Sequence, residues 1–209
     1  MIIAIDGSAA SGKGTLAKRL ATHLGLSYLD TGALYRAVGL QLLNAGQDIK
    51  NIDENQCIKS CVELDITLTT SALIRNEKVA EMASVVAAIP AVRLALVDLQ
   101  RQFAATPPDP NGAILDGRDI GTVVLPHADF KFFIDADINT RAERRTKELL
   151  QAGQSVMFRD VLSDMQERDS RDWFRSAAPL RPADDAISID TSSMDADDVL
   201  ALALSHITP

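Results

Sequence analysis

The hydrophobic pattern of the first 40 or so residues alternates between strand-like and helix-like stretches. An apolar run at residues 2–5 is followed by a glycine-rich segment, and residues 16–24 then show apolar positions at helical spacing. A short apolar step at residues 27–30 and a second helical pattern from Thr31 onward repeat this order. Strands that alternate with helices are typical of a parallel sheet, so the pattern predicts an α/β fold.

The pattern is less regular in residues 46–89. Residues 57–64 favour a short helix, residues 66–69 alternate as a strand does, and residues 76–88 are again helical. This part is too short and too poor in bulky apolar side chains to form a hydrophobic core of its own. We therefore expect an insert in the main domain rather than a second domain.

The α/β pattern returns in the second half of the chain. Pro90 suits the first turn of a helix, which we expect to continue to Phe103. Buried strands are predicted at residues 113–116, 130–134 and 186–190, and helices at residues 140–150, 160–174 and 195–205. The chain is therefore predicted to be one domain, residues 1–209.

The glycine-rich segment has the composition of a phosphate-binding loop. Its residues are Gly7, Ser8, Ala9, Ala10, Ser11, Gly12, Lys13, Gly14 and Thr15. Such a loop turns backbone N–H groups toward an anion, and the helix that follows adds its free N–H groups. Lys13 would contact the outer phosphates and Thr15 would offer a hydroxyl to Mg²⁺. Because Gly14 separates Lys13 from Thr15, the match to the usual motif is displaced by one residue, and the alternative is a flexible turn that contains a lysine.

Composition narrows the range of partners. The formal net charge is −8 and aromatic residues make up only 4% of the chain, so we expect no nucleic acid polymer as a partner. No apolar run reaches the roughly 20 residues of a membrane span, and the start of the chain lacks a signal peptide pattern, so we expect a cytoplasmic protein and no membrane contact. Cys57 and Cys61 are predicted to be buried free thiols.

A second group of charged residues follows the predicted strand at residues 113–116. Asp116 ends this strand, and Arg118 and Asp119 come directly after Gly117. Ligands of open α/β sheets bind at the carboxyl ends of the strands. A carboxylate at this position is typical of a Mg²⁺ ligand in phosphate-loop proteins, although a helix cap or a turn acid is the alternative.

Two basic clusters lie in the predicted helices on either side of Gly153. Arg168, Asp172 and Arg175 recur at positions i, i+4 and i+7, which places them on one helix face. The second cluster consists of Arg141, Arg144 and Arg145. Two basic helices joined by a glycine turn favour a mobile clamp over phosphates, although a solvated charged face is the alternative for the first cluster.

Several of these segments resemble the bacterial cytidylate kinase family. The resemblance rests on the phosphate loop, on residues 30–36 (DTGALYR), on residues 116–124 (DGRDIGTVV), and on residues 167–169 (ERD) followed by residues 178–180 (APL). It implies a nucleoside monophosphate kinase fold of the P-loop class. This fold has a five-stranded parallel sheet flanked by helices, an insert for the monophosphate at about residues 46–89 and a short lid at about residues 151–162.

The resemblance also implies roles for individual residues. The phosphate loop would bind the ATP phosphates, Arg144 would lie near ATP, and Thr15 and Asp116 would hold Mg²⁺. Residues implied for the acceptor and the transferred phosphate are Arg36, Arg118 and Arg175, which with Lys13 form the implied catalytic set. Ser84, Arg93, Asp119 and the Thr31 hydroxyl would face cytosine, Tyr35 would belong to the same substrate site, and Arg168 and Asp172 would hold the ribose.

Two positions depart from the usual pattern of the family. Thr31 stands where the bacterial family usually has serine, which keeps the hydroxyl and adds a methyl group. Residues 68–75 are shorter than the strand–turn–strand that the family usually has there, so the insert is expected to be trimmed.

The implied reaction is transfer of the ATP γ-phosphate to CMP or dCMP, which yields the diphosphate and ADP. Catalysis would consist of positioning the reactants and neutralising charge, and we expect the protein to act as a monomer. Two alternatives remain. One is a phosphate-loop kinase for another small acceptor, such as UMP, AMP or shikimate, and the other is a nucleotide-binding regulatory module.

Overall fold

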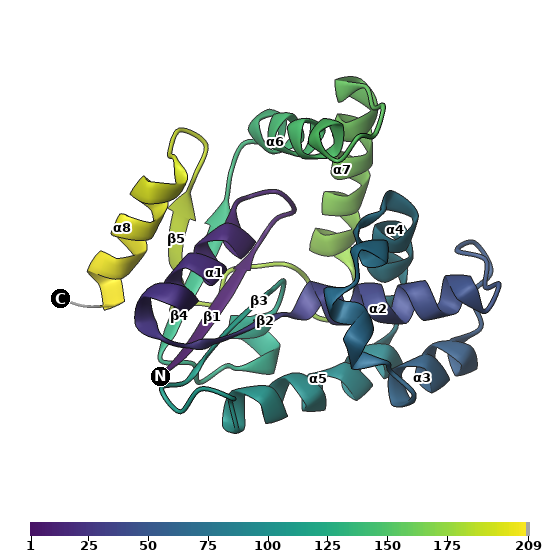
Figure 1. The fold of residues 1–209 in the computed structure, drawn as a ribbon, viewed down its shortest axis with the longest axis horizontal. Coiled ribbons are helices and arrows are strands. Elements are labelled where there is room, and N and C mark those ends of the chain that lie inside the picture. The colour runs from purple at the N-terminus through teal and green to yellow at the C-terminus, as the bar shows by residue number, and fades with distance from the viewer. Residues whose placement is uncertain (208–209) are drawn as a thin grey trace.

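A five-stranded parallel sheet forms the centre of the molecule in the computed structural model, which describes residues 1–207 (Figure 1). The strand order is β2-β3-β1-β4-β5, with β1 in the middle. The strands are β1 (Ile2–Gly7), β2 (Ser27–Asp30), β3 (Ala113–Gly117), β4 (Phe130–Asp135) and β5 (Ile187–Asp190). All the neighbouring strands are parallel, so their carboxyl ends, including the end of β1 that leads into the glycine-rich loop, meet at one edge.

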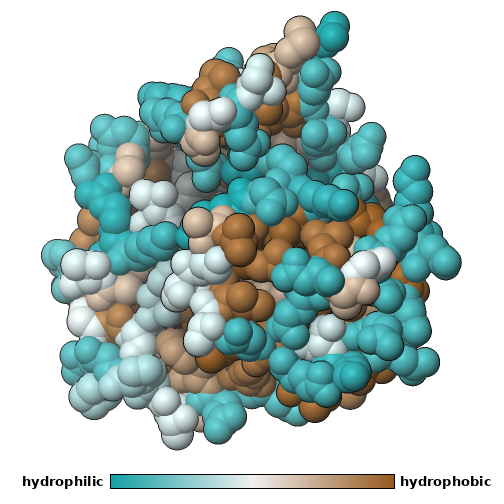
Figure 2. Space-filling view, turned by 45° about the vertical axis from the view of Figure 1, so that its right-hand side comes forward, coloured by the Kyte–Doolittle hydropathy of each residue, from teal (hydrophilic) through white to brown (hydrophobic). Residues whose placement is uncertain are grey.

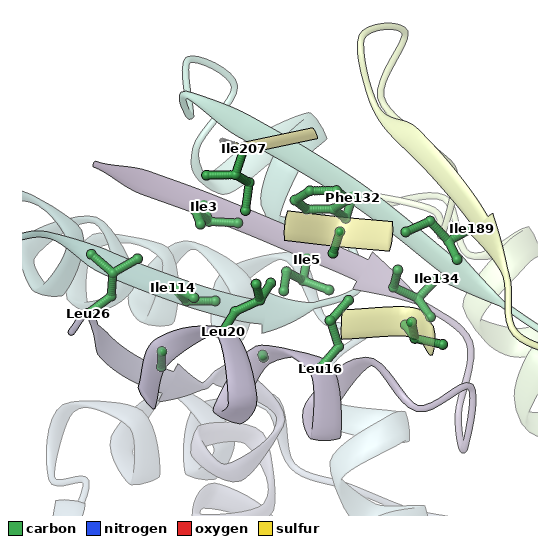
Figure 3. Packing of buried hydrophobic residues seen from close by; sticks show 14 residues of the cluster. Ile3, Ile5, Leu16, Leu20, Leu26, Ile114, Phe132, Ile134, Ile189 and Ile207 are labelled. Carbon is green, nitrogen blue, oxygen red and sulfur yellow. The ribbon is translucent and has the colours of Figure 1, made fainter. Parts of the chain in front are cut away.

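Helices cover both faces of the sheet. On one face, α1 (Lys13–Leu24) and α8 (Ala196–Ile207) pack against the apolar side chains of the central strands. Figure 3 shows Leu16 and Leu20 of α1 pointing at Ile5 and Ile134 in this core. On the other face lie α5 (Pro90–Ala105) and a π-helical turn, η3 (Ile120–Val124), which share a second core with β1 and β3.

A helical lobe extends from one side of the sheet (Figure 1). It is built from α2 (Thr31–Asn44), α3 (Glu54–Val62), the 3₁₀ turns η1 (Ile66–Thr70) and η2 (Ala72–Arg75), α4 (Glu77–Val86) and part of α5. Its core includes Leu34, Leu42, Met82 and Leu96, none of which is more than 1% exposed. Figure 2 looks at the molecule with this lobe turned forward and shows apolar residues across the middle of that face.

The remaining two helices follow each other in the chain and pack together at the carboxyl edge of the sheet (Figure 1). They are α6 (Ile138–Gln151) and α7 (Phe158–Phe174), and their connection contains Gly153 at a φ of +78°. The pair packs on the phosphate loop through Ala9, Ala142 and Val161. The tip of this pair stands at the top of the views in Figures 1 and 2.

The predicted elements agree with these bounds except in the insert. The five predicted strands of the core and the six helices outside the insert are all confirmed, as are the two helices predicted within residues 46–89. The strand predicted at residues 66–69 is wrong, because this stretch forms η1. The cause is local: Asp65 accepts hydrogen bonds from the backbone and hydroxyl of Thr67, and the Thr69 hydroxyl donates to the Ile66 carbonyl, which together favour a turn over a strand.

Two further expectations concern cysteines and membranes. Cys57 and Cys61 are buried free thiols, as predicted. Within residues 1–207, no single helix is long and apolar enough to cross a membrane. The pair α4 and α5 passes this test of length and composition together, but it is bent by 99°.

Candidate active site

A cleft of about 900 Å³ lies at the carboxyl edge of the sheet, between the phosphate loop, the helical lobe and the α6–α7 pair. Most of the site residues predicted from the sequence line it. They are Ala9, Ala10, Gly12, Lys13, Gly14, Thr15, Thr31, Tyr35, Arg36, Ser84, Arg93, Asp116, Arg118, Asp119, Arg144, Arg168, Asp172 and Arg175. Gly7, Ser8 and Ser11 belong to the loop but do not line the cleft. Residues from widely separated parts of the chain, from the loop after β1 to the end of α7, therefore meet in one cavity.

The phosphate loop is shaped to receive an anion. Gly7 has a φ of +151°, and a Cβ there would lie 1.9 Å from the Ile134 carbonyl oxygen, so only glycine fits. Gly12 has a φ of +91°, a Cβ there would meet no atom within 4 Å, and no side chain caps the start of α1. The N–H groups of the first turn thus remain available to a ligand.

Lys13 lies inside this loop. Its Nζ donates to the Ser8 carbonyl at 3.1 Å. Desolvation and the nearby Arg118 lower its pKa to about 7, so the ammonium lacks full compensation for its charge. The Ser8 and Ser11 hydroxyls are also buried without a hydrogen-bond partner among the described residues. These features fit the phosphates of a nucleotide, which would supply negative charge and acceptor oxygens.

Asp116 lies next to the loop, at the end of β3. It pairs with Asp30 across β2 and β3 and accepts a hydrogen bond of 3.2 Å from the Tyr28 hydroxyl. Burial and the nearby Asp30 raise the pKa of Asp116 to about 6. Within residues 1–207, no group of three or more His, Cys, Asp or Glu side chains could hold a metal ion. A site with one protein carboxylate and a hydroxyl suits Mg²⁺, which keeps most of its ligands from water and phosphate.

Two buried carboxylates, Asp119 and Asp172, form ion pairs with arginines in the cleft. The Arg93 guanidinium donates to Asp119, and the Arg175 Nη2 lies 3.8 Å from the other oxygen of Asp119. The Arg118 Nε donates to Asp172 at 2.9 Å. Burial disfavours the charged form of Asp172, but Arg118 and Arg168 hold its pKa below the ordinary value. Each carboxylate thus fixes the direction in which its arginine points.

Two more predicted residues support these pairs. The Tyr35 ring lies under Arg93, with 5.9 Å between the ring centroid and the guanidinium carbon, a distance at which a cation and an aromatic ring attract. Burial and the neighbouring Arg118 lower the pKa of Arg168 to about 10, and its Nε has no hydrogen-bond partner among the described residues. Arg168 is therefore a cation that a bound anion would stabilise.

A search of known families decides which protein family this fold and cleft belong to. A family model described as cytidylate kinase matches residues 3–209. The chain belongs to the cytidylate kinase family. The cytidylate kinase of Paramagnetospirillum magneticum is 53% identical over 206 residues, which cover 99% of this chain and 97% of that protein. The cytidylate kinase of Methylocella silvestris is 53% identical over 204 residues, which cover 98% and 92% respectively.

One solved structure supports the fold independently. An uncharacterized protein from Eubacterium ventriosum superposes with a TM-score of 0.55 over 99% of this chain and 98% of that chain. Its sequence is only 17% identical, so this likeness concerns the fold alone. The α/β fold and the membership in the family, both expected from the sequence, are thereby confirmed.

Not every residue of the expected phosphate clamp faces the cleft of this family member. Arg141 does not line the cleft, so the prediction that it belongs to the phosphate clamp is wrong. Its side chain is 5% exposed, it donates to the carbonyls of Ala136 and Ala9, and it forms an ion pair with Asp169. The cause is its position on α6, on the side that packs against the phosphate loop. Arg144 lines the cleft, but its guanidinium donates to the Thr191 hydroxyl and carbonyl.

Three other predicted residues have partners that the sequence did not show. The Ser84 hydroxyl accepts from Arg171 of α7 at 3.3 Å, and the Thr31 hydroxyl donates to the Asp116 carbonyl at 2.7 Å. Arg175 follows the last residue of α7 and has an extended backbone, so it does not continue the helix face of Arg168 and Asp172 as predicted. Its guanidinium nevertheless lies 3.8 Å from Asp119.

Sequence reasoning missed several residues that line the cleft. They include Lys18, Tyr28 and Asp30. One signal for Asp30 was present: it ends an apolar strand, as Asp116 does, and strands of a parallel sheet end at the same edge. Arg145 was noticed as part of a basic cluster, but its ion pair with Glu77 of α4 depends on how α6 and α4 approach each other, which no local pattern predicts.

Proposed function

We propose that this protein transfers the γ-phosphate of ATP to CMP or dCMP, forming CDP or dCDP and ADP. The observation that carries the proposal is that the phosphate loop and the buried Arg93–Asp119 pair open into the same cleft. A phosphate donor in the loop and a pyrimidine at the pair would thus share one solvent-shielded space. Both curated relatives described above are called cytidylate kinases, which supports the same choice of acceptor.

The donor side of the proposal concerns Lys13 and the loop. The loop N–H groups and the start of α1 would hold the ATP phosphates, and Lys13 would neutralise charge on the transferred group. Thr15 and Asp116 would hold Mg²⁺, an ion that adds positive charge to the phosphates when it is bound. Arg144, which now bonds to Thr191, would lie on the ATP side of the cleft.

The acceptor side concerns the arginines opposite the loop. Arg36, Arg118 and Arg175 would bind the acceptor and transferred phosphates, and Arg168 with Asp172 would hold the ribose. No general base is needed, because the acceptor phosphate is already ionised. The enzyme must instead hold the phosphates of ATP and of the acceptor close together, and the arginines of the cleft reduce the repulsion between these anions.

The choice of base concerns Asp119 and Arg93. Cytosine presents an amine donor and a ring-nitrogen acceptor, where uracil presents a carbonyl acceptor and an N–H donor. A carboxylate accepts from the cytosine amine, and an arginine donates to the ring nitrogen or carbonyl of cytosine. With uracil, the Asp119 carboxylate would face the carbonyl acceptor of the base, and the Arg93 guanidinium would face its N–H donor. Thr31, Tyr35 and Ser84 would support this end of the site.

The proposal extends to how the chain is organised. Residues 46–89 would serve as the insert that binds the monophosphate, and residues 151–162 as a lid, within one domain of residues 1–209. Of this domain, residues 208 and 209 lie outside the described residues. We further propose a monomer that acts in the cytoplasm on small molecules, without a nucleic acid or membrane partner.

A panel of acceptors tests the proposed function. ADP formation from ATP would be measured with CMP, dCMP, UMP, AMP and shikimate, with no other protein present. The Lys13→Ala variant, purified in parallel, reports any contaminating kinase or ATPase. We expect CMP and dCMP to be the best acceptors. Preference for another acceptor would favour a different small-molecule kinase, and absence of turnover with every acceptor would favour a regulatory module.

A further inference from the structure

Asp6 is a buried carboxylate that none of the roles above uses. It is the residue before Gly7 in β1 and is only 4% exposed. Its two oxygens each accept a backbone hydrogen bond of 2.7 Å, one from the Ile120 N–H and one from the Gly121 N–H. These donors are more than 100 residues further along the chain and open the π-helical turn η3. Asp6 thus caps the first turn of η3 from another element.

The capped turn carries Asp119. The Val123 and Val124 N–H groups both donate to the Asp119 carbonyl, at 2.9 and 3.2 Å, so Asp119 is the first residue of this hydrogen-bonded unit. No side-chain hydrogen bond from within the turn caps it. The Asp6 carboxylate therefore takes the place of a local cap, and the orientation of Asp119 toward Arg93 depends on where the turn is held.

The backbone of β1 does not depend on this carboxylate. Asp6 pairs in register with Gly117 of β3 and with Phe133 of β4, and these ladders hold the strand that leads into the phosphate loop. Removal of the side-chain charge would release η3 but leave β1 in the sheet. Loss of the Asp6 carboxylate should therefore impair binding of the acceptor more than binding of ATP.

The two N–H donors favour a carboxyl group at this position, although burial opposes its charged form. Burial raises the pKa of Asp6 to about 7 in spite of the two N–H donors, and the nearby Asp119 adds to this rise. Burying a carboxylate costs free energy of folding, and hydrogen bonds from backbone N–H groups offset only part of that cost. An apolar residue would fill the same space at lower cost, but it would leave the two N–H groups of η3 without acceptors.

We propose that Asp6 is a positioning residue that sets the acceptor base specificity by holding η3, and with it Asp119, against the central strand. The inference rests on the proposed function, since it concerns the choice between CMP and UMP. It assigns Asp6 no contact with substrate. Its action passes through the Ile120 and Gly121 N–H groups to the Asp119 carboxylate.

The test compares Asp6→Asn with Asp195→Asn. The Asp6→Asn amide keeps the shape of the side chain but turns an NH₂ group against one of the two N–H donors. Asp195 is a matched control because it also accepts from two consecutive backbone N–H groups, those of Asp197 and Asp198, at the start of α8 away from the cleft. The readouts are kcat/KM for CMP and for UMP, the KM for ATP, and the thermal unfolding midpoint.

For Asp6→Asn we expect kcat/KM for CMP to fall about tenfold or more, kcat/KM for UMP to change little, and the KM for ATP to stay within about threefold. Asp195→Asn should leave the ratio of the two kcat/KM values unchanged. An equal loss for CMP and UMP, or a loss confined to ATP, would overturn the proposal. Wild-type turnover of CMP, measured in the same assay, checks the proposed function separately because it does not depend on Asp6.

A second variant covers the case in which Asp6→Asn does not fold. Asp6→Ser carries no NH₂ group and leaves both N–H groups to water, and it would be assayed at low temperature with saturating ATP, which stabilises the folded state. As with Asp6→Asn, we expect kcat/KM for CMP to fall more than kcat/KM for UMP, so that the ratio of the two values becomes smaller. Failure of both variants to fold under these conditions would make Asp6 a purely structural residue and would contradict the proposal.

Discussion

Lys13 illustrates how a single residue can be held ready for a ligand. Its ammonium donates a hydrogen bond to the Ser8 carbonyl, a neutral acceptor, and its pKa is lowered to about 7 by desolvation and by Arg118. A group in this condition gains more from a bound phosphate than an exposed lysine would, because the anion supplies the missing counter-charge. Its role can be tested both by turnover and by proton uptake.

The first prediction is that Lys13→Ala lowers kcat by about 10²–10³ or more, as the loss of a single transition-state donor typically does. The KM for ATP should change less, since the loop N–H groups remain. Steady-state kinetics with CMP as acceptor would measure both. Near-normal turnover of the variant would remove Lys13 from the mechanism.

The second prediction is that ATP binding at pH 8 is accompanied by uptake of up to one proton. Lys13 is mostly neutral at this pH in the free protein, and the bound phosphates raise its pKa so that it becomes charged. Asp116 starts from a pKa of about 6, well below pH 8, so a moderate rise of its pKa leaves most of this carboxyl ionised and its share of the uptake small. Calorimetric titrations in two buffers of different ionisation enthalpy would measure the number of protons.

Lys13→Ala should abolish this uptake, and Lys59→Ala, on the exposed side of α3, should retain it. The sign follows from the direction of the shift: a lysine whose pKa rises on binding takes protons up at pH values between its two pKa values. Binding without proton uptake by the wild type would show that Lys13 is already charged in the free protein.

At the scale of elements, α6 and α7 touch the helical lobe at few points. Arg145 of α6 pairs with Glu77 of α4 and with Glu148, and Arg171 of α7 donates to Ser84 of α4. The Arg145–Glu77 and Arg171–Ser84 contacts join the α6–α7 pair to α4 beside the cleft. The Arg145 and Glu77 side chains are 23% and 49% exposed, so solvent screens their attraction.

The third prediction is that Glu77→Gln has only a small effect. An ion pair of this exposure contributes about 0–1 kcal/mol, which corresponds to no more than about fivefold in KM for CMP. Glu81→Gln, an exposed acid on the same helix, is the matched control. The small effect should shrink further at high ionic strength, because salt screens exposed charges. A loss of a hundredfold would mean that this contact is essential to closure.

The elements also show what can be predicted from a sequence. The strands and helices of the core were predictable, because each has a clear apolar period and a glycine, proline or acidic residue at its end. The strand predicted at residues 66–69 was wrong, because Asp65, Thr67 and Thr69 satisfy the backbone locally. An alternation of apolar and polar residues over only four positions is weak evidence for a strand, and here the three side chains that favour a turn outweigh it.

Within the site, residues carried by a motif were predictable and residues that depend on tertiary contacts were not. The phosphate loop and the Arg118–Asp119 pair were identified from residue type and spacing. The Arg141 side chain is predicted to belong to the clamp because it shares a helix with Arg144, yet it is buried against the phosphate loop and bonds to Ala9 and Asp169. Asp6 carried no local signal, because its partners lie more than 100 residues away.

At the scale of the whole molecule, the fold brings the proposed donor and acceptor sites into one cleft from several separate parts of the chain. The phosphate loop comes from residues 7–15, the Arg118–Asp119 segment follows β3, and Arg168, Asp172 and Arg175 come from the end of α7. Buried pairs between the last two parts, Arg118 with Asp172 and Asp119 with Arg175, make the acceptor side one connected unit. Under the proposed function, base specificity would therefore be a property of this unit rather than of one residue.

The fourth prediction concerns this unit and the central claim that cytosine is the preferred base. The most direct measurement is kcat/KM for CMP and for UMP, on the wild type and on Asp119→Ala. We expect the wild type to prefer CMP by about a hundredfold or more, because uracil would leave buried polar groups mismatched. Asp119→Ala should lower the CMP value strongly and the UMP value little. An equal loss for both would show that the substitution disturbs a phosphate contact of Arg118, and a wild type that uses UMP as well as CMP would contradict the account.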